Sequence, residues 1–186
     1  MDAAALLFAR DGYATTPMRS IAAEAGVSIQ SVNLAGPKSS LLLAAFERTF
    51  AGDEGSHSLL ERPELREILA EPDPRVALAR YAAYLAAANN RSAGIWGALN
   101  AAADADELVR VAAADLESRR RRDMSLGVAG LAERGLVAEE SVGVAADVLG
   151  LLTSPTTFLY LTRECGWSLS QYEGWLATSI TALVIR

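Results

Sequence analysis

Side chains with catalytic or metal-binding chemistry are scarce in this sequence. His57 is the only histidine, and no nucleophile stands in a recognisable arrangement with it. Glu54 and His57 have the Glu-x-x-His spacing of paired metal sites in helical bundles, but such sites need two copies of it. We therefore expect no metal site and no cofactor, and the sequence gives no support for an all-helical enzyme.

A short polar segment near the N-terminus offers a different chemistry. Gln30 and Asn33 carry amides that can pair with adenine through two hydrogen bonds, and Ser31 can bond a base edge or a phosphate. They follow a tight turn at Gly26, after which Ser28 can cap a short helix. A helix, a glycine-containing turn and a short capped helix form the helix-turn-helix arrangement, whose second helix enters the major groove of DNA.

Helix-breaking residues predict four helices in the first fifty residues. The expected helices are 3–10, ending at Asp11-Gly12, one from Thr16-Pro17 to Gly26, 29–34, and one beginning at Pro37. Thr16 is expected to be the N-cap of the second helix. Val27 and Val32 are expected to face the core.

The rest of the chain is also predicted to be helical. Residues 52–74 are looser, around a short helix near 64–70, and the later expected helices are 74–89, 92–103, 104–134, 139–164 and 169–185. Pro155 should kink the helix 139–164, because it cannot donate to the carbonyl of Leu151. The apolar run from Val142 to Thr162 contains Asp147, so a helix buried by its neighbours explains it better than a membrane span.

Composition agrees with an all-α fold of about nine helices, because alanine and leucine are abundant, prolines are few, and alternation of Val, Ile and aromatic residues is nearly absent. Hydrophobic residues make up 51% of the chain and charged residues 22%, which suits a globular chain that fills a core. The net charge of −6 falls entirely in residues 49–186, since four basic and four acidic side chains balance in residues 1–48. The single cysteine, Cys165, suits a reducing compartment, and we expect a cytoplasmic protein.

A family resemblance covers about a quarter of the chain. The segment LLFARDGYATTPMRSIAAEAGVSIQSVNLAGPKSSLLLAAFE resembles the N-terminal domain of TetR-type transcriptional regulators. The matching positions are Phe8, Gly12, Tyr13, Thr16, Ile21, Ala22, Ala25, Gly26, Val27, Ser28, Lys38, Leu41 and Leu42. A weaker resemblance links RECGWSLSQYEGWLA to the last-helix segment of many members. Asn33 replaces an aromatic that usually touches phosphate, an aromatic is missing around Ala35-Gly36, and one residue is deleted before Lys38.

The resemblance implies a three-helix helix-turn-helix domain (1–48) joined to a larger helical ligand-binding and dimerisation domain (49–186). It implies a regulator, in the first place a repressor, that binds a palindromic operator as a homodimer and is released by a small, mostly apolar effector. The expected DNA contacts are Thr16, Arg19, Ser28, Ile29, Gln30, Ser31, Asn33 and Lys38. The departures leave an alternative open: a member that has lost operator binding and acts as a helical ligand-binding or interaction protein.

Two further sets of residues are assigned to the larger domain. Tyr84, Trp96 and Phe158 are either core residues or the lining of a ligand pocket between helices, with Asn100 as a polar contact. The dimer is expected to form a four-helix bundle from the last two helices of each subunit. Its expected contacts recur at helical spacing: Ala145, Leu149, Leu152, Thr156, Leu159, Tyr172, Leu176, Ile180 and Leu183.

Two charge features complete the sequence-based expectations. The run Arg119–Arg122, with Glu117 and Asp123 beside it, is expected to be a solvated helix face rather than a nucleic-acid patch. Family members generally have several residues, often basic, before the segment that matches 4–8, and Met1 falls almost at that point. We therefore expect an internal or misassigned start, and an upstream-extended chain should bind DNA more tightly with a steeper salt dependence.

Overall fold

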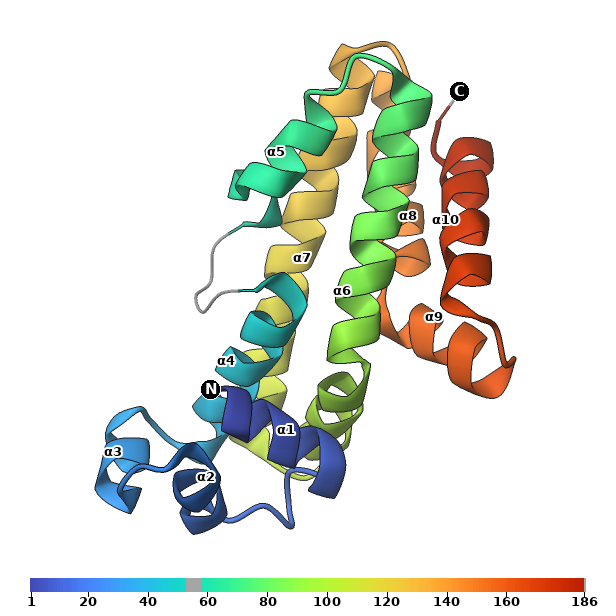
Figure 1. Ribbon diagram of the computed structural model, residues 1–186. Coiled ribbons are helices and arrows are strands. Elements are labelled where there is room, and N and C mark those ends of the chain that lie inside the picture. The colour runs from blue at the N-terminus through green and yellow to red at the C-terminus, as the bar shows by residue number, and fades with distance from the viewer. Residues whose placement is uncertain (53–57, 186) are drawn as a thin grey trace. The chain divides into compact units, whose positions relative to one another are not determined.

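The computed structural model describes residues 1–52 and 58–185, in which all regular structure is helical (Figure 1). The α-helices are α1 (Asp2–Asp11), α2 (Met18–Ala25), α3 (Ile29–Leu34), α4 (Lys38–Ala51), α5 (Pro63–Leu69), α6 (Pro74–Ala103), α7 (Glu107–Glu133), α8 (Val142–Leu152), α9 (Pro155–Leu159) and α10 (Leu169–Leu183). Shorter turns are η1 (Leu59–Glu61), η2 (Glu139–Ser141) and the π-helical η3 (Tyr160–Glu164). The predicted all-α fold is confirmed.

The helices form two compact units. The first contains α1 to α4 together with residues 91–116, and the second contains η1, α5, residues 74–90 and the chain from 117 onward. Both α6 and α7 therefore contribute residues to both units. The domain boundary after residue 48 remains a prediction, since the compact units divide the chain differently.

The core of the first unit joins α1 to α4 with the end of α6 and the start of α7. Within it α1 contacts α2 and α4, and α2 contacts α3. Its largest buried side chains include Phe8, Leu42, Ile95, Leu99 and Val109. Each such side chain removes apolar surface from water, which contributes about 1.5–3 kcal/mol for a Leu, Ile or Phe.

Helix α6 is longer than the two helices predicted in its place. The expected break near Asn89 is wrong, and the helix runs unbroken for 30 residues. An asparagine disturbs a helix when its amide competes for the local backbone. Here the buried Asn89 amide instead donates to the carbonyl oxygen of Thr153 at 3.1 Å and to the hydroxyl of Tyr172 at 3.3 Å. These distant partners remove the reason for a break.

The predicted helix 139–164 is divided rather than kinked. Helix α8 ends at Leu152 and α9 begins at Pro155, with a bend of 40°. The carbonyl of Leu151, which Pro155 cannot satisfy, accepts from the Thr157 hydroxyl at 2.7 Å. The Ser154 hydroxyl accepts from the Thr157 amide at 3.0 Å and so caps α9. At this break, the Leu151 carbonyl and the Thr157 amide therefore both have a side-chain partner.

Helix α10 lies alongside α8 and begins with a complete capping box (Figure 1). The Ser168 hydroxyl accepts from the Gln171 amide, while the Gln171 side chain accepts from the Ser168 amide. The buried Tyr172 hydroxyl donates to the Leu152 carbonyl at 3.2 Å, which ties the start of α10 to the end of α8. Ser168 is therefore the N-cap of α10.

No single helix in the described residues is long and apolar enough to cross a membrane. The bent pair 139–152 and 155–164 meets the length and composition requirements only when its two halves are taken together.

The capture of the Asn89 amide generates a stability prediction. Replacing Asn89 by Ala should lower the free energy of unfolding by about 1–3 kcal/mol, because buried partners lose a hydrogen bond. The neighbouring Asn90→Ala, at an exposed position, is the matched control and should change it by less than about 0.5 kcal/mol. Urea denaturation followed by circular dichroism measures both. Equal effects of the two variants would contradict the role given to Asn89.

Candidate nucleic-acid interface and ligand cavity

The predicted helix-turn-helix is formed by α2, a turn and α3. Gly26 adopts the left-handed conformation, with φ 65° and ψ 28°. Its amide donates to the Ala23 carbonyl, and the Val27 amide donates back to the Ala22 carbonyl at 3.0 Å. This pair of bonds is the Schellman arrangement, which closes the end of a helix within a few residues. Glycine is required there because the left-handed conformation disfavours side chains.

The third helix has the limits that the sequence predicts, and Ser28 caps it. The Ser28 Oγ accepts from the Ser31 amide at 3.1 Å and lies 2.9 Å from the Ser31 Oγ. Val32 is buried as expected and anchors the helix to the core. The expectation for Val27 is wrong: it lies in the turn just after Gly26 and is 48% exposed.

Most of the predicted DNA-contacting residues lie on the surface. The exposed members are Arg19, Ser28, Ile29, Gln30, Ser31 and Asn33. Leu34 was not among the predicted contacts, yet it is 89% exposed at the end of α3. The register fixed by the buried Val32 turns Leu34 toward solvent.

Thr16 is neither an N-cap nor a surface residue. Pro17 occupies the N-cap position of α2, and the Thr16 side chain is 1% exposed. Its hydroxyl donates to the Gly12 carbonyl at 2.7 Å and lies 3.4 Å from the Leu7 carbonyl. Thr16 therefore holds the connection between α1 and α2 from inside, and its assignments as a cap and as a DNA contact are corrected.

Lys38 is half-buried and faces the loop between α1 and α2. Its ammonium donates to the Ala14 carbonyl at 3.4 Å and lies 4.3 Å from the centre of the Tyr13 ring, a cation–π geometry. Partial burial lowers the pKa of the Lys38 ammonium. A phosphate contact by Lys38 stays a prediction, and these intramolecular contacts compete with it.

A hydrogen bond between distant residues was not foreseen from sequence. The Tyr13 hydroxyl donates to the Asp106 carboxylate at 2.8 Å, although 93 residues separate them. Asp106 also accepts from the amides of Leu108 and Val109 and so caps α7. The Tyr13 bond, foremost, lowers the pKa of Asp106, while burial and this bond raise the pKa of Tyr13 to about 12. An aspartate at the start of a helix is a common N-cap, so the sequence suggests this role for Asp106. Nothing in the sequence indicates that Asp106 also bonds to Tyr13.

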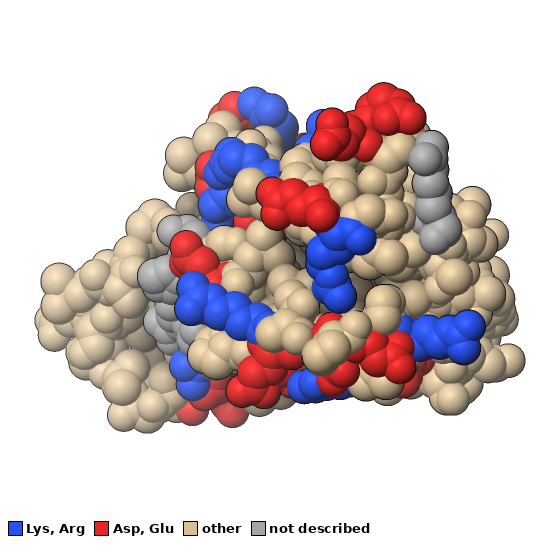
Figure 2. All heavy atoms as spheres, turned by 90° about the horizontal axis from the view of Figure 1, so that it is seen from above, with Lys and Arg blue, Asp and Glu red and all other residues tan. Residues whose placement is uncertain are grey.

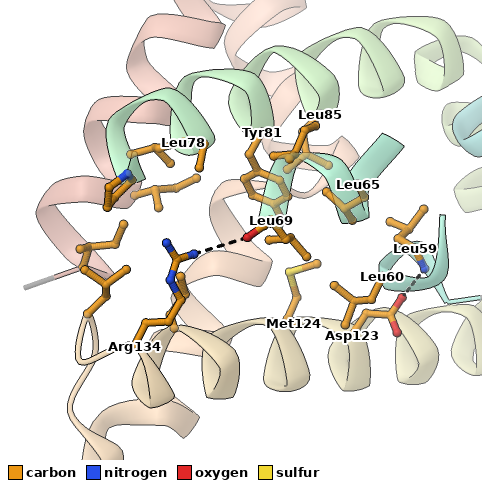
Figure 3. A pocket seen from close by; sticks show the side chains of 18 residues that line it. Leu59, Leu60, Leu65, Leu69, Leu78, Tyr81, Leu85, Asp123, Met124 and Arg134 are labelled. Carbon is orange, nitrogen blue, oxygen red and sulfur yellow. Dashed lines mark hydrogen bonds between the residues drawn. The ribbon is translucent and has the colours of Figure 1, made fainter. Parts of the chain in front are cut away.

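The second unit contains a cavity of about 90 Å³ beneath η1 and α5 (Figure 3). Aliphatic side chains from η1, α5, α6, α7 and the chain end supply most of its lining, including Leu59, Leu65, Leu78, Met124 and Ile180. A small number of polar groups in an apolar lining is typical of a small-molecule site.

Three polar side chains line this cavity. The Asp123 carboxylate accepts from the Ser58 hydroxyl at 2.7 Å and from the Leu59 amide at 2.9 Å, which holds η1 against α7. The Arg134 guanidinium lies 3.4 Å from the Leu69 carbonyl at the other side (Figure 3). The Tyr81 phenol lies between them, and burial raises its pKa above the ordinary value. Asp123 is thus already engaged, while Tyr81 and Arg134 face the cavity.

The four predicted ligand residues do not line this cavity, and the structure does not bring them together. Trp96 packs on Phe46 in the first unit, with ring centres 5.2 Å apart, and Asn100 is exposed. Phe158 is buried edge-on against Tyr172 in the second unit, where Tyr84 is half-buried. For Trp96 and Phe158 the core interpretation left open by the sequence agrees with these contacts.

The arginine run on α7 is largely compensated within the chain. Arg120 pairs with Glu117 at 2.8 Å and donates to the Gly150 carbonyl at 2.8 Å. Arg121 lies 3.7 Å from the same Glu117, and Arg122 donates to the Ser118 hydroxyl. Acidic and basic side chains are similarly interleaved over the described residues visible in Figure 2. Arg121 and Arg122 are exposed, as expected for a solvated face, whereas Arg120 is half-buried against α8.

The metal-site hypothesis concerns residues that the structure does not describe. Glu54 and His57 lie outside the described ranges. Among residues 1–52 and 58–185, no group of three histidine, cysteine or acidic side chains is arranged to hold a metal ion.

The predicted dimer residues are mostly core residues of the chain itself. Six are buried in the second unit: Ala145, Leu149, Leu152, Tyr172, Leu176 and Ile180. Thr156 and Leu183 are exposed, and Leu159 is half-buried. Helical periodicity shows that a face is buried, but not whether its own chain or a partner covers it. The assignment of the six buried residues to a subunit interface is therefore corrected.

Residues 1–34 match the sequence profile of the bacterial regulatory proteins of the tetR family. The N-terminal segment is thus similar to the DNA-binding domain of the TetR family. The matched residues contain α1, α2 and α3, which are the elements that build the helix-turn-helix. The prediction of a TetR-type transcriptional regulator is confirmed at this level. No curated protein matches the chain.

Solved structures similar to this TetR-type chain cover nearly its whole length. A protein from Rhodococcus sp. assigned to the TetR family has a TM-score of 0.75 at 18% identity, over 98% of this chain and 94% of that one. A protein from Mesorhizobium loti MAFF303099, also assigned to the TetR family, has a TM-score of 0.73 at 21% identity. The match covers 97% of this chain and 90% of that one. A protein from Saccharomonospora viridis, assigned as a transcriptional regulator and solved in complex with choline, has a TM-score of 0.70 at 19% identity. The match covers 99% of this chain and 94% of that one. At these identities the similarity establishes the fold.

The cap of α3 generates a prediction for the TetR-type domain. Ser28→Ala should lower the free energy of unfolding by about 0.5–2 kcal/mol, because the Ser31 amide loses its acceptor. Ser28→Asn, which retains a capping oxygen, should remain close to the original chain. Chemical denaturation gives the free energies, and gel-shift titration gives the DNA affinity, which should fall with the first variant. If Ser28→Ala matches Ser28→Asn in both measurements, the cap does not determine the order of α3.

Proposed function

We propose that this chain is a ligand-responsive transcriptional repressor that binds a palindromic DNA operator as a homodimer and is released by a small, mostly apolar effector. The observation that carries the proposal is α3, which presents Ile29, Gln30 and Asn33 to solvent inside a TetR-type domain. A helix of this kind, anchored by one buried side chain and capped at its start, suits insertion into a major groove.

Two continuous helices supply a route between effector and DNA. Helices α6 and α7 line the cavity through Tyr81 and Met124, and the same helices bury Leu99 and Val109 in the core of the first unit. A ligand that shifts either helix therefore acts on the DNA-binding domain. In a dimer the two recognition helices must fit half-sites about 34–36 Å apart, so a small change in their spacing releases DNA.

Selection from a pool of random palindromic duplexes tests operator binding directly. The purified chain should enrich a palindrome and shift it in a gel at nanomolar concentrations, about 10³-fold or more below those needed for unrelated DNA. Binding of all duplexes with one weak affinity would contradict the proposal. It would favour the alternative, a TetR-type protein that has lost operator binding.

The cavity favours a neutral or acidic effector with an apolar body. Its lining is aliphatic apart from Tyr81, Asp123 and Arg134, and the Asp123 carboxylate already accepts two hydrogen bonds. The phenol of Tyr81 and the guanidinium of Arg134 donate hydrogen bonds, which suits a carbonyl or an acidic group. The similar protein from Saccharomonospora viridis was crystallised with choline, a cation. The cavity of the present chain lacks a free anionic partner for such a ligand among the described residues.

Two glycines on α7 allow the cavity to be filled with a matched control. Gly127 lines the cavity, and a Cβ there would lie 4.0 Å from Leu60, while Gly130 lies outside the lining and has open space around it. Gly127→Leu should weaken binding of phenol, a probe of a size that suits a cavity of about 90 Å³, about tenfold, since overpacking costs about 1–3 kcal/mol. Gly130→Leu should bind it as the original chain does.

Isothermal titration calorimetry of phenol with each full-length variant gives these affinities. Equal affinities for Gly127→Leu and Gly130→Leu would place the probe elsewhere and contradict the assignment of the cavity. Trp96→Ala and Asn100→Ala, at the positions first expected to bind ligand, should leave the probe's affinity unchanged.

The dimer is proposed to form through the outward faces of α8 and α10. Val144 and Leu151 are two helical turns apart on α8 and are 71% and 65% exposed, and Leu183 on α10 is also exposed. Their neighbours Ala145 and Leu152, turned by about 100° around the helix, are buried. Pairing two α8–α10 faces in a four-helix bundle removes this apolar surface from water.

A charge on α8 tests this interface. Leu151→Arg should raise the dissociation constant of the dimer by about 30-fold or more, equivalent to about 2 kcal/mol, because a charge is left in an apolar contact. Leu126→Arg, at a similarly exposed leucine of α7, should leave it unchanged. Sedimentation velocity at micromolar concentration measures both. A monomeric original chain, or a dimeric Leu151→Arg variant, would contradict the proposed interface.

A further inference from the structure

The exposed face of α3 has a composition that distinguishes one kind of base pair from the other. Successive helical residues are turned by about 100°, so the buried Val32 lies on the side of α3 opposite Gln30 and Leu34. The remaining side chains follow one another in an arc around the helix, in the order Ile29, Asn33, Gln30, Leu34 and Ser31, all of them exposed. Two amides therefore lie side by side between two aliphatic side chains.

The arc and its surroundings lack charge. Residues 25–37 contain no acidic or basic side chain. Guanine is contacted most often by Arg or Lys through its O6 and N7, and cytosine donates its amino group to Glu or Asp. The next cation along the chain, Lys38, lies over the Tyr13 ring and donates to the Ala14 carbonyl. The face therefore lacks the side chains that favour G·C pairs.

We infer that α3 recognises A·T base pairs, with the Gln30 and Asn33 amides on adenine N6 and N7 and with Ile29 and Leu34 on the 5-methyl group of thymine. An A·T pair presents adenine N7 and N6 and the thymine methyl group on the same major-groove edge, with the thymine O4 between them. An exposed leucine at the end of α3, which has no partner in the core, gains a contact there. This inference rests on the proposed function and adds which bases and which atoms are recognised.

The duplexes selected by the full chain from a random pool supply the first test. The positions of each half-site that α3 protects should be A·T pairs. Enriched sites with G·C pairs at the protected positions would overturn this inference and leave the proposed function intact. A complete lack of enrichment would overturn the proposed function as well, so the two failures are distinguishable.

Removing single methyl groups supplies the second test. Deoxyuridine in place of the protected thymidines deletes the 5-methyl group and keeps the hydrogen-bonding edge. Affinity should fall about fourfold for each methyl group that is removed from beneath an aliphatic side chain. The double variant Ile29→Ala/Leu34→Ala should bind the thymidine and deoxyuridine duplexes equally, while the control Leu126→Ala should keep the preference. Equal binding of the two duplexes by the original chain would overturn the methyl contacts.

The amides are tested by a change of preference rather than by a loss. Asn33→Arg introduces a guanidinium, which donates to guanine O6 and N7, at the centre of the arc. When the selection is repeated with this variant, one A·T pair of each half-site should be replaced by a G·C pair. Because the readout is a new preference, a variant that merely folds poorly does not mimic it. Retention of the original sequence by Asn33→Arg would show that Asn33 does not contact a base.

Discussion

The capture of the Asn89 amide by the Thr153 carbonyl and the Tyr172 hydroxyl is the interaction on which the second unit depends most. It joins α6 to the end of α8 and to α10, and it occupies a polar side chain that would otherwise compete for the backbone of α6. A buried amide is costly when its bonds are missing and stabilising when they are made, so this packing is specific as well as tight. The unbroken α6 lets one helix serve the cavity and the core of the DNA-binding domain.

Local signals in the sequence predicted the beginning and end of most N-terminal elements. Gly26 and Ser28 act through neighbours within a few residues, so a linear sequence contains what is needed to recognise them. Thr16 and Asn89 show where that reasoning fails. Each has a type that suits a helix end, but Thr16 donates back to the Gly12 carbonyl, four residues before it, and Asn89 donates to the Thr153 carbonyl, 64 residues away. Which of several carbonyls a polar side chain bonds to depends on the backbone path and on tertiary contacts, and the residue type alone does not determine it.

Sequence periodicity likewise predicted which side chains are buried, but not whether their own chain or a second subunit covers them. The stripe through Leu149, Leu176 and Ile180 is buried as predicted, but within one chain. The two interpretations of the aromatic residues could not be separated from sequence for a related reason. Trp96 and Phe158 were expected either to fill the core or to line a pocket, and they pack against Phe46 and Tyr172. The cavity has an aliphatic lining drawn from five separate segments, and no single stretch of sequence marks such a set.

The balanced charge of residues 1–48 has a consequence for how such a regulator would be distributed in a cell. Attraction to arbitrary DNA comes from phosphate neutralisation, which a domain of zero net charge on an acidic chain supplies sparingly. Most copies would then be free in solution rather than stored along the chromosome. Operator occupancy would follow the free concentration closely, so a small number of molecules would suffice to fill one site. Each dissociated copy would also search by diffusion through solution, with little sliding along the duplex.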